Sequence, residues 1–221
     1  MNKDLTIKRR IGYFFLFLGW QMLIFMFVGN AKDALWLQII NYLFAYTIAY
    51  YGVIKCLSLD ETSLTKDKHL LFETVGLRFI SLFGAIIGYR LFLFALGVQQ
   101  SVSDNQASLN SLLDSPLRFV FLLVMAIAIA PFIEEFCFRY LMLYKVKHQK
   151  LMMIISALLF AFVHMIGQSL NLYWFTDYIQ YFIIGIFFAY NFVKSQSYKQ
   201  SVLLHSLWNV VSVILMVISI K

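Results

Sequence analysis

Two adjacent carboxylates and a guanidinium stand inside an otherwise apolar run of this chain. Glu134, Glu135 and Arg139 lie between Phe119 and Leu143, where nearly every other residue is hydrophobic. A charged side chain in the hydrocarbon core of a bilayer costs roughly 2.5–3.5 kcal/mol on insertion scales, so it normally faces a protein interior or a water-filled cavity. The three groups therefore predict polar partners elsewhere in the chain.

Three further polar side chains in apolar segments are candidates for those partners. His164 follows a Phe-rich stretch that begins at Phe160. His205 and Asn209 are four residues apart in a later apolar segment, so they share one face of a helix. Alone, each could be a hydrogen-bonding group between two helices. Because all must avoid lipid, we expect them to face the bundle interior and to meet the carboxylates there.

These residue types permit general-base chemistry on water. A carboxylate and an imidazole can hold a water molecule and remove its proton, while a second imidazole and an amide can donate hydrogen bonds to an oxyanion. Glu134, His164 and His205 could also hold one zinc or other divalent metal ion, because zinc accepts imidazole and carboxylate ligands. The HExxH zinc motif is absent. A metal-bound water and a water held directly by Glu and His both stay open.

The two neighbouring carboxylates are predicted to have different roles. Successive residues of a helix point about 100° apart, so Glu134 and Glu135 cannot face the same spot equally. Glu135 precedes Arg139 by four residues, which is the spacing and order that favour a salt bridge. Glu134 is then the better candidate for the free base.

The composition is that of a polytopic membrane protein. Of the 221 residues, 62% are hydrophobic and only 13% are charged, and this predicts an all-α transmembrane helical bundle. We expect a single membrane domain over residues 1–221, with a motif-bearing core at about 117–220. The net charge of +7 could suggest a nucleic-acid partner, but the basic residues lie in short loops beside apolar spans, where they orient a membrane protein. No nucleic-acid partner is expected.

About seven spans are expected, with roughly 20 apolar residues per helix as the template. They cover Ile11–Val28, Ala34–Ile54, Leu71–Val98, Leu117–Tyr144, Leu151–Gly167, Tyr178–Val193 and Ser201–Ile220. Two cysteines, Cys56 and Cys137, show no CxxC spacing or disulfide framework, and each is expected to be a small buried apolar residue.

The charges of the loops predict a cytosolic N-terminus. Twelve Lys and Arg residues fall in the four segments Met1–Arg10, Lys55–His69, Lys145–Lys150 and Lys194–Lys199, and two fall in the segments on the other side. This asymmetry follows the positive-inside rule. Counted from the predicted cytosolic ends at about 1.5 Å per residue, Glu134, His164 and His205 lie at about 15, 20 and 9 Å. They meet only if helices are tilted or kinked, and Pro131 could supply a kink.

At these residues the sequence resembles the CAAX protease and bacteriocin-processing family of intramembrane proteases, abbreviated CPBP and also called the Abi family. That family shows an EExxxR motif, an FxxxH motif and an HxxxN or HxxxD/B motif on successive membrane helices. Here the three motifs begin at Glu134, Phe160 and His205, in the same order.

The resemblance implies a multi-pass peptidase of the cell membrane that hydrolyses a peptide bond of a membrane-associated peptide or protein. It implies that Glu134 and His164 activate water, that His205 and Asn209 stabilise the oxyanion, and that Glu135 and Arg139 complete the site. Members are described as metalloproteases and as glutamate-dependent proteases, so the resemblance leaves the metal open.

Two other function classes are compatible with the composition. One is a non-catalytic membrane protein for bacteriocin self-immunity or another interaction, which would not need two carboxylates, two histidines and an asparagine. The other is a small transporter whose buried carboxylates carry protons. An inverted repeat would favour the transporter, and the sequence shows none. The intact set of motifs favours the endopeptidase.

Overall fold

The structure is a computed structural model that describes residues 7–28, 40, 43, 44, 46–52, 72–98 and 116–219. Across these residues the regular secondary structure is helical and includes no strand. This confirms the predicted all-α class. Cys56 and residues 101–115, the latter between the predicted spans Leu71–Val98 and Leu117–Tyr144, lie outside the described residues.

The described helices follow the predicted spans closely. They are α1 (Ile7–Val28), a π-helical turn η1 (Phe72–Gly76) that leads into α4 (Leu77–Ala95), α9 (Gln149–His164), α10 (Leu172–Ser195) and α11 (Tyr198–Ser219). Between α4 and α9 lies one long rod made of α6 (Pro116–Val124), η3 (Met125–Ile129), α7 (Ala130–Glu135), η4 (Phe136–Tyr140) and α8 (Leu141–Leu143). Of the predicted span Ala34–Ile54, residues 40, 43, 44 and 46–52 are described, and they are helical.

The sixth predicted span begins earlier than the sequence indicated. Its helix α10 starts at Leu172 rather than at Tyr178. The side chain of Asn171 caps this helix, because its Oδ1 accepts a hydrogen bond from the backbone N–H of Trp174 at 3.0 Å. Trp174, which falls between two predicted spans, therefore lies in the first turn of a helix, and the preceding loop is shorter than predicted.

Four helices of the described part are long and apolar enough to cross a membrane: Thr74–Ala95, Phe119–Leu143, Leu172–Ser195 and Tyr198–Ile218. The helix α9 is also apolar but shorter. Many large apolar side chains point outward, among them Phe94 at 79% exposure and Ile80 at 67%. A bilayer would cover such a surface, so these features agree with the predicted transmembrane bundle.

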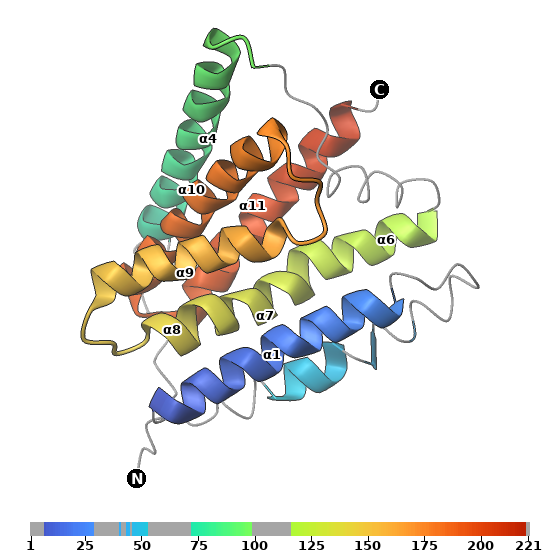
Figure 1. Cartoon of the computed structure of the whole chain (residues 1–221), viewed down its shortest axis with the longest axis vertical. Helices are drawn as coiled ribbons and strands as arrows, with labels where there is room; N and C mark the ends of the chain where they lie inside the picture. Colours follow the sequence, from blue (N-terminus) through green and yellow to red (C-terminus); the bar gives the residue numbers. More distant parts are fainter. Residues whose placement is uncertain are drawn as a thin grey trace.

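The long rod runs through the middle of the bundle. In Figure 1, α1 lies along one side of the α6–α8 rod and α9 along the other, while α4 is steeply inclined to the rod. The basic end of α1 meets the turn after α8, where Arg10 donates a hydrogen bond to the carbonyl of Tyr144. These are two segments that the charge pattern assigns to the cytosol. Their shared end agrees with that assignment, and the membrane orientation itself stays a prediction.

Two π-helical turns interrupt the rod on either side of the carboxylates. In the first, Ala130 donates its backbone N–H to the carbonyl of Met125, five residues back. In the second, Leu141 donates to Phe136 in the same way. The first turn ends two residues before Pro131, which has no N–H and whose ring disfavours a regular α-helical turn before it. The irregularity expected at Pro131 is therefore a π-helical turn, and such turns are frequent at functional sites.

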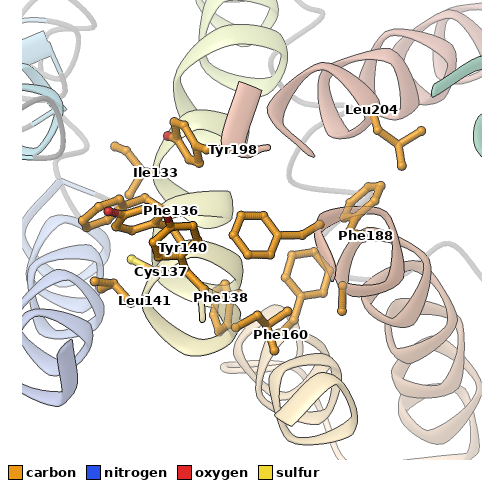
Figure 2. Close-up of a cluster of buried hydrophobic side chains, with 14 of the residues drawn as sticks. Ile133, Phe136, Cys137, Phe138, Tyr140, Leu141, Phe160, Phe188, Tyr198 and Leu204 are labelled. Atoms are coloured by element: carbon orange, nitrogen blue, oxygen red, sulfur yellow. The ribbon is translucent and has the colours of Figure 1, made fainter. Parts of the chain in front are cut away.

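Aromatic side chains fill the interior where the rod, α9, α10 and α11 meet. Figure 2 shows Phe138, Phe160 and Phe188 gathered from three elements, with Leu204 of α11 nearby. Cys137 is buried in the same cluster, as expected for a small apolar residue.

The helices α9 and α10 approach each other closely at Gly185. A Cβ atom at this position would lie 3.0 Å from the Cα atom of Ala157. Small residues allow such backbone contact between membrane helices. This contact fixes α9, which ends at His164, against α10.

Candidate active site

Glu135 is a fully buried carboxylate held by three partners from two elements. From η4, the next segment of the rod, Arg139 lies with Nε 3.4 Å from Oε2, which is the ion pair expected from the spacing. From α11, Ser201 donates its hydroxyl to the same oxygen, and Nδ1 of His205 lies 2.9 Å from Oε1. Charge-assisted hydrogen bonds of this kind are stronger than neutral ones. Glu135 therefore joins the rod to α11 through two buried hydrogen-bonding contacts.

The buried charge of Arg139 is balanced by the carboxylate and by aromatic rings. Its Nη1 donates to the hydroxyl of Ser156 at 2.6 Å, and Ser156 donates in turn to the carbonyl of Phe138 at 2.6 Å. The guanidinium carbon lies 4.9 Å from the ring centroid of Phe160 and 5.9 Å from that of Phe188. A cation over a ring face in a dry site is stabilised by the ring quadrupole. Arg139 thus links Glu135 to Ser156 of α9 and to the aromatic rings of the interior.

Glu134 is the less constrained of the two carboxylates. Its side chain is 19% exposed, whereas that of Glu135 is fully buried. Within the described part of the chain, its Oε2 has no hydrogen-bond partner. The nearest ionisable neighbours of that oxygen are Nε2 of His164 at 3.7 Å and Nε2 of His205 at 3.9 Å. This contrast with Glu135 agrees with the different roles predicted from the spacing to Arg139.

Hydrogen bonds at Nδ1 fix the orientation of both imidazoles. Nδ1 of His164 lies 2.8 Å from the carbonyl of Phe160, which can only accept, so this nitrogen carries the proton. Nδ1 of His205 faces the carboxylate of Glu135, which also accepts. In the neutral tautomers, each Nε2 then presents a lone pair toward Glu134. Three electron-rich atoms converge, and a water molecule, a proton or another cation would satisfy them.

Aromatic rings hold the two imidazoles in place. The ring centroid of His164 lies 4.6 Å from that of Tyr181 and 4.3 Å from that of Phe160. The ring of His205 lies 4.4 Å from that of Phe188. This packing limits rotation of both imidazoles. The Phe of the FxxxH motif therefore contributes a ring contact and a backbone acceptor to its own His.

The structure brings together Glu134, Glu135, His164 and His205, although their depths differ when counted along straight, upright helices. The helix α11, which carries His205, is inclined to the rod in Figure 1 and packs against it around the carboxylates. Asn209, one turn beyond His205, donates from Nδ2 to the carbonyl of Ala126 at 2.7 Å. The structure thus gives Asn209 a backbone partner, and its role as an oxyanion donor stays a prediction.

Three residues of this site were not predicted from the sequence. Ser201 precedes His205 by one turn, so the spacing SxxxHxxxN was a signal for it. Ser156 lies on the face of α9 that carries Phe160 and His164, at intervals of four residues. Tyr181 had no comparable signal, because one Tyr among many aromatic residues of an apolar helix is ordinary packing.

The carboxylate of Glu134 and the imidazoles of His164 and His205 are side chains that can bind a metal ion. Their positions in the structure do not form a set of metal ligands. Within the described residues, no group of three or more His, Cys, Asp or Glu side chains is placed to hold a metal ion. Zinc would need each ligand atom at about 2.0–2.2 Å from the ion. A metal held by Glu134, His164 and His205 stays a prediction.

The family of this part of the chain follows from a direct comparison. Residues 116–211 match the family model described as type II CAAX prenyl endopeptidase Rce1-like. This segment is an Rce1-like domain. It runs from the start of α6 into α11 and contains all six residues of the predicted site, which confirms the family resemblance. No curated protein and no solved structure shows significant similarity to the chain.

The Rce1-like match and the apolar helices together make the chain a multi-pass membrane protein. The description of the matched family model is that of a prenyl endopeptidase. The match ends at residue 211 and begins at residue 116, so it does not bear on α1 or α4. The assignment of residues 1–221 to one domain stays a prediction.

Proposed function

We propose that this chain is an intramembrane endopeptidase of the cell membrane that hydrolyses a peptide bond in a membrane-associated peptide or protein. The observation that carries this proposal is the unpartnered Oε2 of Glu134 opposite Nε2 of His164. The Rce1-like match supports the same reaction class. It favours an enzyme over a non-catalytic immunity protein or a proton-coupled transporter.

A water molecule fits the two acceptors. Glu134 Oε2 and His164 Nε2 are 3.7 Å apart, so a water oxygen can lie about 2.8 Å from each, to one side of the line between them. Its two O–H bonds then point to two acceptors, and a lone pair stays free for a substrate carbonyl. Glu134 removes one proton as the water attacks the carbonyl carbon, acting as general base.

The tetrahedral intermediate needs a donor for its oxyanion and a proton for its leaving group. The carboxylate of Glu135 at Nδ1 stabilises a protonated His205, whose Nε2–H can then donate to the oxyanion. The carboxamide of Asn209 has a second N–H beside the one bound to Ala126. Glu134 returns its proton to the amine nitrogen as the C–N bond breaks. The products are a carboxylic acid and an amine.

A proteolysis assay with purified protein in liposomes tests this function. The probes are a farnesylated CAAX peptide, suggested by the family description, and an unprenylated membrane-associated peptide. We expect the wild type to cleave at least one of them, and Glu134→Gln to be present at normal amounts without activity. His148→Ala, at an exposed position between α8 and α9, is the matched control and should cleave normally. Full activity of Glu134→Gln would contradict the proposal.

A further inference from the structure

The carbonyl of Ala126 lies at a gap in the backbone hydrogen bonds of the rod. In an α-helix it would accept from the N–H of Ala130, but that N–H donates to Met125 instead. In a π-helix it would accept from residue 131, but Pro131 has no N–H. Both intrahelical donors are therefore lost. In an apolar interior a carbonyl without a donor is costly, so it requires one from elsewhere.

That donor comes from α11. Nδ2 of Asn209 lies 2.7 Å from the oxygen of Ala126, across 83 residues of sequence. Pro131 itself lies three residues before Glu134 on α7 and is buried. Pro131 and Asn209 are thus linked through the carbonyl of Ala126.

We propose that Pro131 is a positioning residue for Asn209, because it keeps the carbonyl of Ala126 available as an anchor for the carboxamide. One N–H of Nδ2 is held by this carbonyl, and the planar amide then fixes the direction of the other. Asn209 shares a helix face with His205, so the same anchor holds the part of α11 that carries the imidazole. The catalytic consequence rests on the proposed function, whereas the anchor itself does not.

A double-mutant cycle on thermal stability tests the anchor. In Pro131→Ala, residue 131 or residue 130 supplies an N–H to Ala126, whichever helical register is adopted. Asn209→Ala should therefore lower Tm in the wild-type background and leave Tm nearly unchanged in the Pro131→Ala background. Contacts that share a partner give such non-additive effects. Equal losses of Tm in the two backgrounds would overturn the proposal.

Two further variants keep the cycle interpretable. Ser201 lies on α11, as Asn209 does, but its hydroxyl bonds to Glu135 and not to Ala126. Ser201→Ala should therefore lower Tm equally in both backgrounds. Asn209→Leu is close in size but has no donor, so in the wild-type background it should lower Tm as Asn209→Ala does. An unchanged Tm for Asn209→Leu would overturn the anchor even if Pro131→Ala does not accumulate.

Turnover separates this inference from the proposed function. In an active wild type, Pro131→Ala should lower kcat with little change in KM, and adding Asn209→Ala should cause little further loss. If the Tm effects of Pro131→Ala and Asn209→Ala are non-additive but the wild type cleaves neither peptide, the proposed anchor is supported and the proposed endopeptidase function is rejected. Additive Tm and kcat effects in an active wild type would reject the anchor and keep the endopeptidase.

Discussion

Nδ1 of His205 lies 2.9 Å from Oε1 of Glu135, although the two residues are 70 positions apart in the sequence. This contact joins the second carboxylate of the rod to the imidazole of α11. The adjacent carboxylate, Glu134, is then the one that faces the Nε2 atoms of His164 and His205. The two carboxylates are therefore distinguished by their partners, and substitutions should distinguish them too.

Glu135→Gln and Arg139→Ala should lower the stability of the protein together with its activity. Each leaves a partner charge uncompensated in a dry interior, at a cost on the order of 3–5 kcal/mol. The measurement is the amount of folded protein in the membrane, its Tm and its specific activity, with Glu134→Gln as the matched variant. If Glu135→Gln is stable and inactive while Glu134→Gln keeps full specific activity, the two roles are reversed.

Ser201→Ala should destabilise the protein by about 1.5–3 kcal/mol, which is the range for a hydrogen bond to a charged group. The hydroxyl of Ser201 donates to Glu135 in a buried position. Ser212→Ala, on the same helix, is the control, because the hydroxyl of Ser212 is exposed and donates to the backbone of Trp208. Similar Tm values for the two variants would show that Ser201 does not support Glu135.

His164→Ala should abolish cleavage while the amount of protein in the membrane stays normal. Its Nε2 is the acceptor that we assign to the catalytic water. His205→Ala should keep a trace of activity, since the loss of one oxyanion donor typically lowers the rate by about 10²–10³. Rates and amounts are compared with His148→Ala. Unchanged turnover in His164→Ala would remove this residue from the site.

Metal analysis decides between the two ways of activating water. If Glu134, His164 and His205 hold a zinc ion, chelation should abolish cleavage and added zinc should restore it, with one metal per active chain by elemental analysis. His164→Ala should then bind less metal than His148→Ala. Cleavage by protein without stoichiometric metal would exclude the metal-dependent version.

The elements of this fold were largely predictable because lipid imposes a simple rule on sequence. Long apolar runs become helices, and most boundaries agree within a few residues. The start of α10 was missed because the cap by Asn171 is a local hydrogen bond that hydropathy does not detect. The pair of Glu135 and Arg139 was predictable because both residues lie on one helix.

Contacts between helices were harder to predict. Polarity inside apolar spans indicated that Glu134, His164 and His205 would meet, but it did not indicate which Nδ1 would be held by which acceptor. Those details depend on helix crossing and on the π-helical turns. The partner of Asn209 was unpredictable for the same reason, because the free carbonyl of Ala126 exists only through the irregular backbone before Pro131.

The contact of Gly185 with Ala157 has a consequence for how homologous sequences can diverge. A methyl group at position 185 would meet backbone atoms of α9 at 3.0 Å, so no side-chain movement can make room for it. Substitution of Gly185 by any larger residue would therefore require α9, which ends at His164, to move away from α10. Among active homologues we therefore expect glycine at this position to vary less than the lipid-facing residues around it, although Gly185 takes no part in the proposed reaction.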